Sequence, residues 1–151
     1  MILPVDSFVV DASVAAKWRL SDEEHADTAL RVLDDFFTGR IRLFAPGFIR
    51  LEVASALTVA TMGRSPRLAP QSGREAIDEF LAIDIATVAD DTLVAPAYSL
   101  ARKYGCAIYD ALYLALAQRL SLRLITADAR FYRRVGTLPE ILWLPDYSPA
   151  A

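Results

Sequence analysis

Residues 107–117 read AIYDALYLALA, and apolar side chains occur on every side of the helix that this stretch predicts. Such a helix is typical of the centre of a domain. Asp110 is its one charged residue, and at helical spacing it shares a face with Tyr113, Leu114 and Ala117. An ionised carboxylate inside a protein is costly unless it is paired, hydrogen-bonded or bound to a cation. The stretch therefore predicts a buried helix and a carboxylate that needs a partner.

Three other acidic residues occur in similarly apolar surroundings. Asp11 follows the run 8–10, Asp128 follows the run 124–127, and Glu52 lies on the apolar face of a predicted helix, well inside it. The remaining acidic residues mostly stand in mixed, polar segments and predict solvated charge; they include Asp22, Glu23, Glu24, Asp27, Asp34, Asp35, Asp78 and Glu79.

Short apolar strands alternate with helical segments along the whole chain. Strands are expected at 7–11, 41–45, 83–88, 122–127 and 141–144. Helices are expected at 12–18, 22–38, around Glu52 up to Gly63, at 71–82, from Asp90 or Asp91 to Tyr104, over the Asp110 stretch and at 129–134. This alternation predicts one α/β domain over residues 1–151, in which helices cover both faces of a central, mostly parallel sheet.

Two local expectations accompany this outline. The helix at 22–38 should start at a cap formed by Ser21 or Asp22, and its core stripe is predicted to be Ala26, Leu30, Leu33 and Phe37. The terminal segment 146–151 is expected to be a loose tail.

The predicted topology offers the four isolated acids a common location. In open parallel sheets, ligands bind beyond the carboxyl ends of the strands, where the strand order reverses. Asp11 and Asp128 each follow a strand, and neighbouring strands lie about 4.8 Å apart. Glu52 and Asp110 belong to helices that begin at the same edge. We therefore expect all four carboxylates to converge.

A cluster of this kind requires a cation or bound protons. Two unit charges about 5 Å apart repel by about 3 kcal/mol at an effective dielectric constant near 20, and a whole domain is stable by only about 5–15 kcal/mol. The chain has one histidine, His25, and one cysteine, Cys106, so oxygen ligands would hold the ion. This selects magnesium, manganese or calcium over zinc. Hard divalent ions activate water and stabilise charge on phosphate, which indicates phosphodiester hydrolysis.

Each acid also has a purely structural explanation. Asp11, Asp110 and Asp128 stand at or near predicted helix starts, where an aspartate cap contributes about 1 kcal/mol. An ion pair with an arginine would account for Glu52. Cys106 is interpreted as a small core residue and His25 as a surface residue.

Overall charge gives no case for nucleic-acid binding, because the net charge is −3. Local clusters of arginine do give a case for it. Three arginines follow Asp128 and are candidate phosphate contacts, namely Arg130, Arg133 and Arg134; the alternative is that they form a solvated helix face. The chain is 54% hydrophobic, which argues against disorder. No apolar run reaches the roughly 18–20 residues of a membrane span, and the first residues lack a basic signal region. We expect a soluble, cytoplasmic protein with no membrane partner.

Four blocks of the sequence, read together, resemble the acidic blocks of PIN-domain ribonucleases, most closely the VapC toxins of toxin–antitoxin modules. They are VVDAS at 9–13, LEVASAL at 51–57, YDALYLALA at 109–117 and LITADARF at 124–131. The resemblance implies a three-layer α/β/α sandwich and a magnesium- or manganese-dependent endoribonuclease. It also implies a homodimer and a small antitoxin protein that blocks the active site.

The resemblance also assigns residues. Asp11 and Asp110 would contact the metal most directly, Glu52 would orient the attacking water or bind metal, and Asp128 would act through water or a second ion. Ser13 and Thr126 correspond to hydroxyls that support these acids. Family members often carry asparagine where this chain has Ser55, a departure that affects contacts with substrate more than the metal site.

Two alternatives to the nuclease hypothesis stay open at this point. One is a PIN-like module that binds RNA or protein without turnover. The other is a receiver-type signalling domain that accepts a phosphoryl group on an aspartate. A receiver would be expected to carry adjacent acids after the first strand and a lysine after the last, whereas Lys17 and Lys103 are the only lysines here.

Overall fold

The computed structural model describes residues 5–148 and contains one five-stranded sheet in the order β3-β2-β1-β4-β5. Every neighbouring pair of strands is parallel. The strands are β1 (Asp6–Val10), β2 (Ile41–Pro46), β3 (Ala86–Val88), β4 (Arg123–Thr126) and β5 (Ile141–Trp143). The predicted α/β class and parallel sheet are confirmed.

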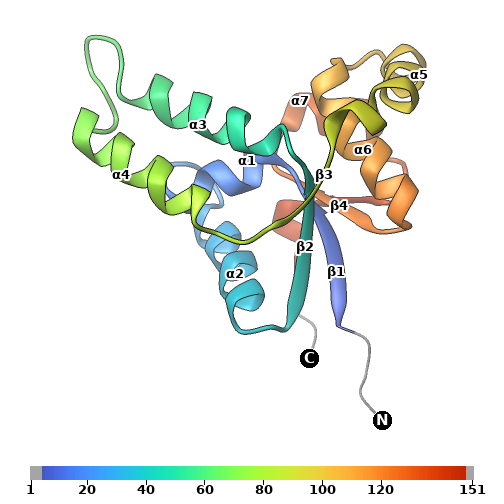
Figure 1. The fold of residues 1–151 in the computed structure, drawn as a ribbon, viewed down its shortest axis with the longest axis horizontal. Coiled ribbons are helices and arrows are strands. Elements are labelled where there is room, and N and C mark those ends of the chain that lie inside the picture. Colours follow the sequence, from blue (N-terminus) through green and yellow to red (C-terminus); the bar gives the residue numbers. More distant parts are fainter. Residues whose placement is uncertain (1–4, 149–151) are drawn as a thin grey trace.

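Helices cover both faces of this sheet, as a three-layer α/β/α sandwich requires. In Figure 1, α5 and α6 lie on one side of the sheet, while α1 to α4 lie on the other. The helices are α1 (Ala12–Ala15), which the 3-10 helix η1 (Ala16–Trp18) continues, α2 (Ala26–Phe37), α3 (Ile49–Ala60), α4 (Pro70–Leu81), α5 (Val94–Tyr104), α6 (Ile108–Leu120) and α7 (Ala129–Val135). Two further 3-10 turns are η2 (Asp90–Thr92) and η3 (Leu144–Asp146).

The centre of the domain is built from β1, β4 and α6. Strands covered on both faces read as continuous apolar runs, and residues 8–10 and 124–126 are all buried accordingly. Helix α6 packs across β1, β2 and β4 and buries every residue from 111 to 117. The predicted buried helix is therefore confirmed, and Asp110 lies at the edge of its buried segment.

Helix α2 differs from its predicted form in both start and orientation. It begins at Ala26, after His25 in a left-handed conformation (φ 62°), and not near Asp22. Leu30 and Phe37 are 43% and 64% exposed, so the predicted core stripe was wrong for these two. Residues three or four positions apart lie on one face of a helix, so the sequence of α2 is compatible with more than one buried face. The face that is buried carries smaller side chains; its residues are Ala26, Ala29, Val32 and Asp35.

The segment before α5 was also predicted incorrectly in detail. The expected strand at 83–88 is shortened to Ala86–Val88, and η2 precedes the helix. Neither Asp90 nor Asp91 caps α5, whose N-cap residue is Leu93 and which has no side-chain cap bond. The Asp90 carboxylate instead accepts the Phe48 N–H at 2.9 Å and so joins the start of α3 to the end of β3. Among residues 5–148, no helix is long and apolar enough to cross a bilayer.

The end of the described chain is anchored, contrary to the expected loose tail. Tyr147 is buried, packs edge-to-face on Phe8 and donates its hydroxyl hydrogen to Asp35 at 2.6 Å. Asp35, expected to be solvated, is 1% exposed and also accepts a hydrogen bond from Arg40 at 3.0 Å. Burial and the bond to Asp35 raise the pKa of Tyr147. The remaining tail residues, 149–151, lie outside the described part of the chain.

The Asp35–Tyr147 bond predicts a clear stability effect. We expect Tyr147→Phe to lower the free energy of unfolding by about 1.5–3 kcal/mol, because a buried hydrogen bond to a charged group is lost. Chemical denaturation measures the change. Tyr98→Phe, at an exposed tyrosine of α5, is the matched control and should be neutral. Equal effects of the two substitutions would contradict this role of Tyr147.

Candidate active site

The strand order reverses between β1 and β4, and the candidate site lies at the carboxyl ends of these two strands. Val10 pairs with Ile125, and the Asp11 N–H continues the ladder by donating to the Ile125 carbonyl at 3.0 Å. Asp128 follows β4 by two residues. The two aspartates therefore leave adjacent strands at one edge, as the sequence predicted.

Helices α3 and α6 deliver the other two acids to this edge. Glu52 lies in the first turn of α3 and Asp110 in the first turn of α6. The prediction that Glu52 lies well inside its helix was wrong, since α3 begins only at Ile49. Asp11, Glu52, Asp110 and Asp128 line a single cavity of about 310 Å³. Four segments that are distant in sequence thus meet in one place.

Hydroxyl groups hold Asp11 in position. Asp11 is 4% exposed, and its Oδ2 accepts hydrogen bonds from Ser13 Oγ at 2.8 Å and Thr126 Oγ1 at 2.7 Å. Ser13 Oγ in turn accepts the Ala127 N–H at 2.9 Å. These bonds connect α1 to the end of β4. Ser13 and Thr126 therefore lie where supporting hydroxyls were expected.

The helix-cap explanation fits only one of the three aspartates. Asp128 accepts the Phe131 N–H at 3.0 Å and caps α7. Asp11 makes no side-chain cap bond to α1, and Asp110 lies inside α6, beyond its N-cap residue Ala107. The structure therefore leaves Asp11 and Asp110 without a role as helix caps.

Glu52 pairs with a tyrosine and not with an arginine. The hydroxyl of Tyr113, a fully buried residue of α6, donates to Glu52 Oε1 at 2.8 Å. Burial is the main cause of a raised pKa for Tyr113, and the nearby carboxylates of Asp11 and Glu52 add to it. The hydroxyl therefore stays protonated and donates its hydrogen bond. Sequence reasoning did not single out Tyr113 as a site residue. The available signal was its position on the same helical face as Asp110.

Three carboxyl groups of the cavity, those of Glu52, Asp110 and Asp11, hold their protons more strongly than free acids do. Burial and then the neighbouring carboxylates raise the pKa of Glu52 to about 7 and that of Asp110 to about 6. Burial also raises the pKa of Asp11, although the Thr126 and Ser13 hydroxyls oppose the shift. The acids are therefore close enough to repel one another, and a cation in the cavity would relieve that repulsion.

The donor set fits a hard divalent ion. Oxygen ligands line the cavity, with neither histidine nor cysteine among its lining residues. Across residues 5–148, however, no three His, Cys, Asp or Glu side chains approach closely enough to hold one ion together. Magnesium commonly keeps several waters and uses only one or two carboxylates, so this spacing suits a hydrated ion better than a fully enclosed one.

Comparison with known proteins places this site in a family. The PIN domain family matches residues 8–136, which include all four acids. The chain belongs to the PIN domain family. Members are generally nucleases that use divalent metal ions. The family match and the sheet order leave no support for the receiver-type alternative.

Solved structures support the same fold for this PIN domain. A toxin–antitoxin complex from Klebsiella pneumoniae aligns with TM-score 0.59 at 17% identity, over 95% of this chain and 98% of that chain. The protein PAE2754 from Pyrobaculum aerophilum aligns with TM-score 0.61 at 20% identity, over 95% of this chain and 93% of that chain. VapBC2 from Rickettsia felis, solved with a DNA fragment from its promoter, aligns with TM-score 0.56 at 11% identity, over 91% and 96%. No curated protein sequence matches significantly.

Two of the three predicted arginines approach the acidic cavity of this PIN domain. Arg130 and Arg134 line a second cavity of about 250 Å³ that shares Asp110 and Asp128 with the first. The positive charge of Arg130 partly offsets the rise in the pKa of Asp110. Arg133 is exposed and lines neither cavity, so the structure does not bring it to the site. Cys106 lines the second cavity, and burial raises its pKa, which favours an unreactive thiol.

Sequence reasoning missed two residues of the acidic cavity. Lys17 and Glu23 both line it, and Lys17 Nζ lies 3.1 Å from Glu23 Oε2. Glu23 was predicted to be a solvated acid, and this was wrong, because its side chain is only 31% exposed. Glu23 lies in the loop between η1 and α2, and no periodic pattern in this polar segment indicates its contact with Lys17.

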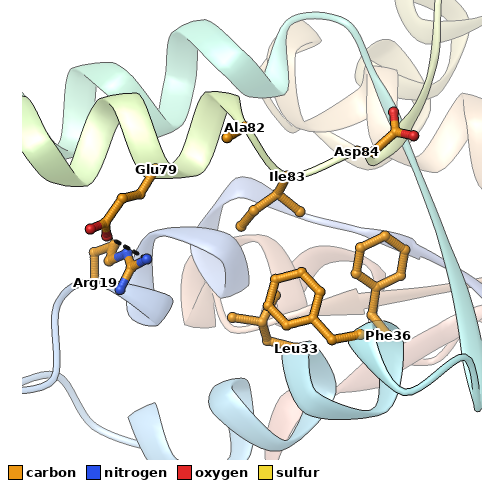
Figure 2. A pocket seen from close by; sticks show the side chains of 8 residues that line it. Arg19, Leu33, Phe36, Glu79, Ala82, Ile83 and Asp84 are labelled. Atoms are coloured by element: carbon orange, nitrogen blue, oxygen red, sulfur yellow. Dashed lines mark ion pairs between the residues drawn. The ribbon is translucent and has the colours of Figure 1, made fainter.

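A larger cavity of this PIN domain lies away from the acids. It has a volume of about 620 Å³, and Figure 2 shows its apolar lining, which includes Leu33, Phe36 and Ile83. The ion pair between Arg19 and Glu79 lies at its side. Among the described residues, only two carboxylate residues, Glu79 and Asp84, line this cavity, so the smaller, acidic one is the better candidate site.

The raised pKa values predict how stability depends on pH. Between about pH 4 and pH 7 the folded, metal-free chain binds more protons than the unfolded chain, because Glu52 and Asp110 titrate near 7 and 6 when folded and near 4.5 and 3.8 otherwise. Stability should therefore fall as pH rises through this window. We expect a lower Tm at pH 7.5 than at pH 5 in EDTA, measured by differential scanning fluorimetry.

Glu52→Gln removes the more strongly shifted group and serves as the internal comparison. It should raise the Tm of the metal-free protein at pH 7.5 and leave that at pH 5 nearly unchanged. Magnesium should raise the wild-type Tm at pH 7.5 by binding the folded state alone. A wild-type Tm that is equal at both pH values and insensitive to magnesium would contradict the electrostatic picture.

Proposed function

We propose that this PIN domain is a magnesium- or manganese-dependent endoribonuclease and the toxin of a type II toxin–antitoxin system. One observation carries the proposal: four carboxylates from separate segments line one cavity at the point where the strand order reverses. The raised pKa values of Asp11, Glu52 and Asp110 follow from that arrangement. The family membership supports nuclease chemistry, and RNA as the substrate is part of the proposal.

The roles proposed for the acids follow from their surroundings. Asp11 and Asp110 would bind the ion most directly, and Asp128, which also caps α7, would act through water or a second ion. A bound divalent ion supplies an activated water and stabilises charge on the phosphate. Glu52 would orient the attacking water or bind the ion, since its carboxylate lines the same cavity. Tyr113 fixes the orientation of Glu52 by donating to Oε1.

Substrate contacts are proposed next to the acids. Hydrolysis forms a bond from a water oxygen to phosphorus and breaks the bond to the leaving ester oxygen, which ends up protonated. Arg130 and Arg134 would contact neighbouring phosphates from their cavity beside Asp110 and Asp128. Ser55 is exposed one turn beyond Glu52, where family members often carry asparagine, and its effect on substrate contacts stays a prediction.

Loss of single carboxylates tests the nuclease proposal. We expect Asp11→Asn and Asp110→Asn to reduce cleavage of structured RNA in magnesium by about 100-fold or more, since each removes an anionic ligand from the site. EDTA should abolish cleavage. Gel analysis of labelled RNA measures both effects, and circular dichroism checks the fold. Asp78→Asn, at an exposed residue of α4, is the control and should cleave normally.

Two results would contradict the proposal in different ways. Cleavage that persists in EDTA or in both variants would come from another site or from a contaminating nuclease. An RNA that binds the wild-type protein in magnesium but is never cut would favour the alternative of a PIN-like binding module without turnover.

The proposed partners are a second copy of the chain and a small antitoxin. Two of the aligned solved structures contain toxin–antitoxin assemblies. Large apolar side chains that the structure leaves exposed on α3 and the turn after it favour a homodimer; they are Leu51, Val59 and Met62. The acidic cavity favours a basic antitoxin segment as its occupant. We place the protein in the cytoplasm, where RNA and magnesium are available.

The antitoxin proposal makes its own prediction. A short reading frame next to this gene should encode a protein that co-purifies with the chain and suppresses RNA cleavage, because a segment seated in the acidic cavity excludes metal and substrate. Cleavage assays with and without the co-expressed protein measure this. Unchanged cleavage in a stable complex would show that the partner does not block the site.

A further inference from the structure

Lys17 is the only basic residue among those that line the acidic cavity. It lies in η1, six residues after Asp11, and its side chain is 10% exposed. An ammonium group so far removed from water is costly unless neighbouring charge compensates it. Five carboxylate residues line the same cavity: Asp11, Glu23, Glu52, Asp110 and Asp128. The lysine is thus held where an anionic substrate must enter.

The pairing of Lys17 leaves part of its bonding capacity free. Its Nζ donates to Glu23 Oε2 at 3.1 Å, the one hydrogen bond that Lys17 makes within residues 5–148. An ammonium group has three hydrogens, so two remain for other acceptors. Glu23 also accepts from Arg67 at its other oxygen, Oε1, at 3.2 Å. Arg67 is held mainly by Asp22, to which it donates at 2.8 and 2.7 Å, so Glu23 Oε2 remains for Lys17 and two ammonium hydrogens are left for a phosphate oxygen.

We propose that Lys17 is a further catalytic residue, which donates a hydrogen bond to a non-bridging oxygen of the scissile phosphate. This inference rests on the proposed function. As water attacks, negative charge grows on the non-bridging oxygens, and the fixed ammonium stabilises it without itself gaining or losing a proton. Glu23, held by Arg67, is the positioning residue that keeps Lys17 in the cavity.

A purely structural role for Lys17 makes a different prediction. In that alternative, the Lys17–Glu23 pair only joins η1 to the loop before α2. Replacing a buried ion pair by apolar side chains of similar size is often neutral or stabilising, whereas removing one partner is strongly destabilising. The double variant Lys17→Met with Glu23→Leu therefore separates the two roles.

The test compares steady-state RNA cleavage in magnesium with thermal stability. We expect Lys17→Met/Glu23→Leu to melt within a few degrees of the wild type and yet to lose about 10²–10³-fold in kcat, the usual cost of removing one such donor. Lys17→Arg should recover part of the loss, because it keeps the charge. KM should change much less than kcat.

Arg19→Gln is the matched control, because Arg19 is a basic residue two positions away whose ion pair with Glu79 lies at the larger, apolar cavity. It should cleave like the wild type. A folded double variant with wild-type kcat would overturn the proposal for Lys17 and leave the nuclease standing.

A second measurement covers the case in which the double variant does not fold. Lys17→Arg and Lys17→Gln both retain Glu23, and Lys17→Arg should keep a larger share of kcat than Lys17→Gln because it keeps the positive charge; equal kcat values at equal stability would overturn the catalytic role. A wild-type protein that cuts no RNA in magnesium or manganese would overturn the inference together with the proposed function.

Discussion

The gathering of several carboxylates in one partly buried cavity is the constraint on which the rest of this site depends. The parallel pairing of β1 with β4 fixes Asp11 and Asp128 at one edge, and the two hydroxyls bonded to Asp11 hold that carboxylate in place. The cost appears as raised pKa values for Asp11, Glu52 and Asp110. Four apolar residues would avoid this cost, so the arrangement marks the cavity as the candidate functional site.

The fold and the site differ in how directly the sequence indicates them. The fully apolar helix α6 and the short apolar runs of β1 and β4 identify their elements by periodicity and length, which is local information. The four acids could be predicted because each interrupts an apolar segment. Their convergence follows from one topological rule about the carboxyl ends of parallel strands.

Other features depend on contacts that no local pattern contains. Asp35 and Glu23 look like solvated charge in sequence, yet the first is enclosed by Tyr147 and Arg40 and the second by Lys17 and Arg67. The orientation of α2 was mispredicted for the same reason, because several stripes of one amphipathic helix are nearly equivalent until a sheet selects among them. Partners distant in sequence decide the burial of charged residues, and these partners become visible only in the folded chain.

The anchoring of Asp35 has a consequence for biosynthesis. Its hydrogen-bond partner Tyr147 stands 112 residues further along the chain. While the ribosome tunnel still encloses the C-terminal segment, α2 therefore carries a carboxylate that lacks this partner, and β1 lacks the aromatic ring that packs on Phe8. The nascent chain consequently completes this part of its hydrophobic core only after Tyr147 has left the tunnel and its turn can dock.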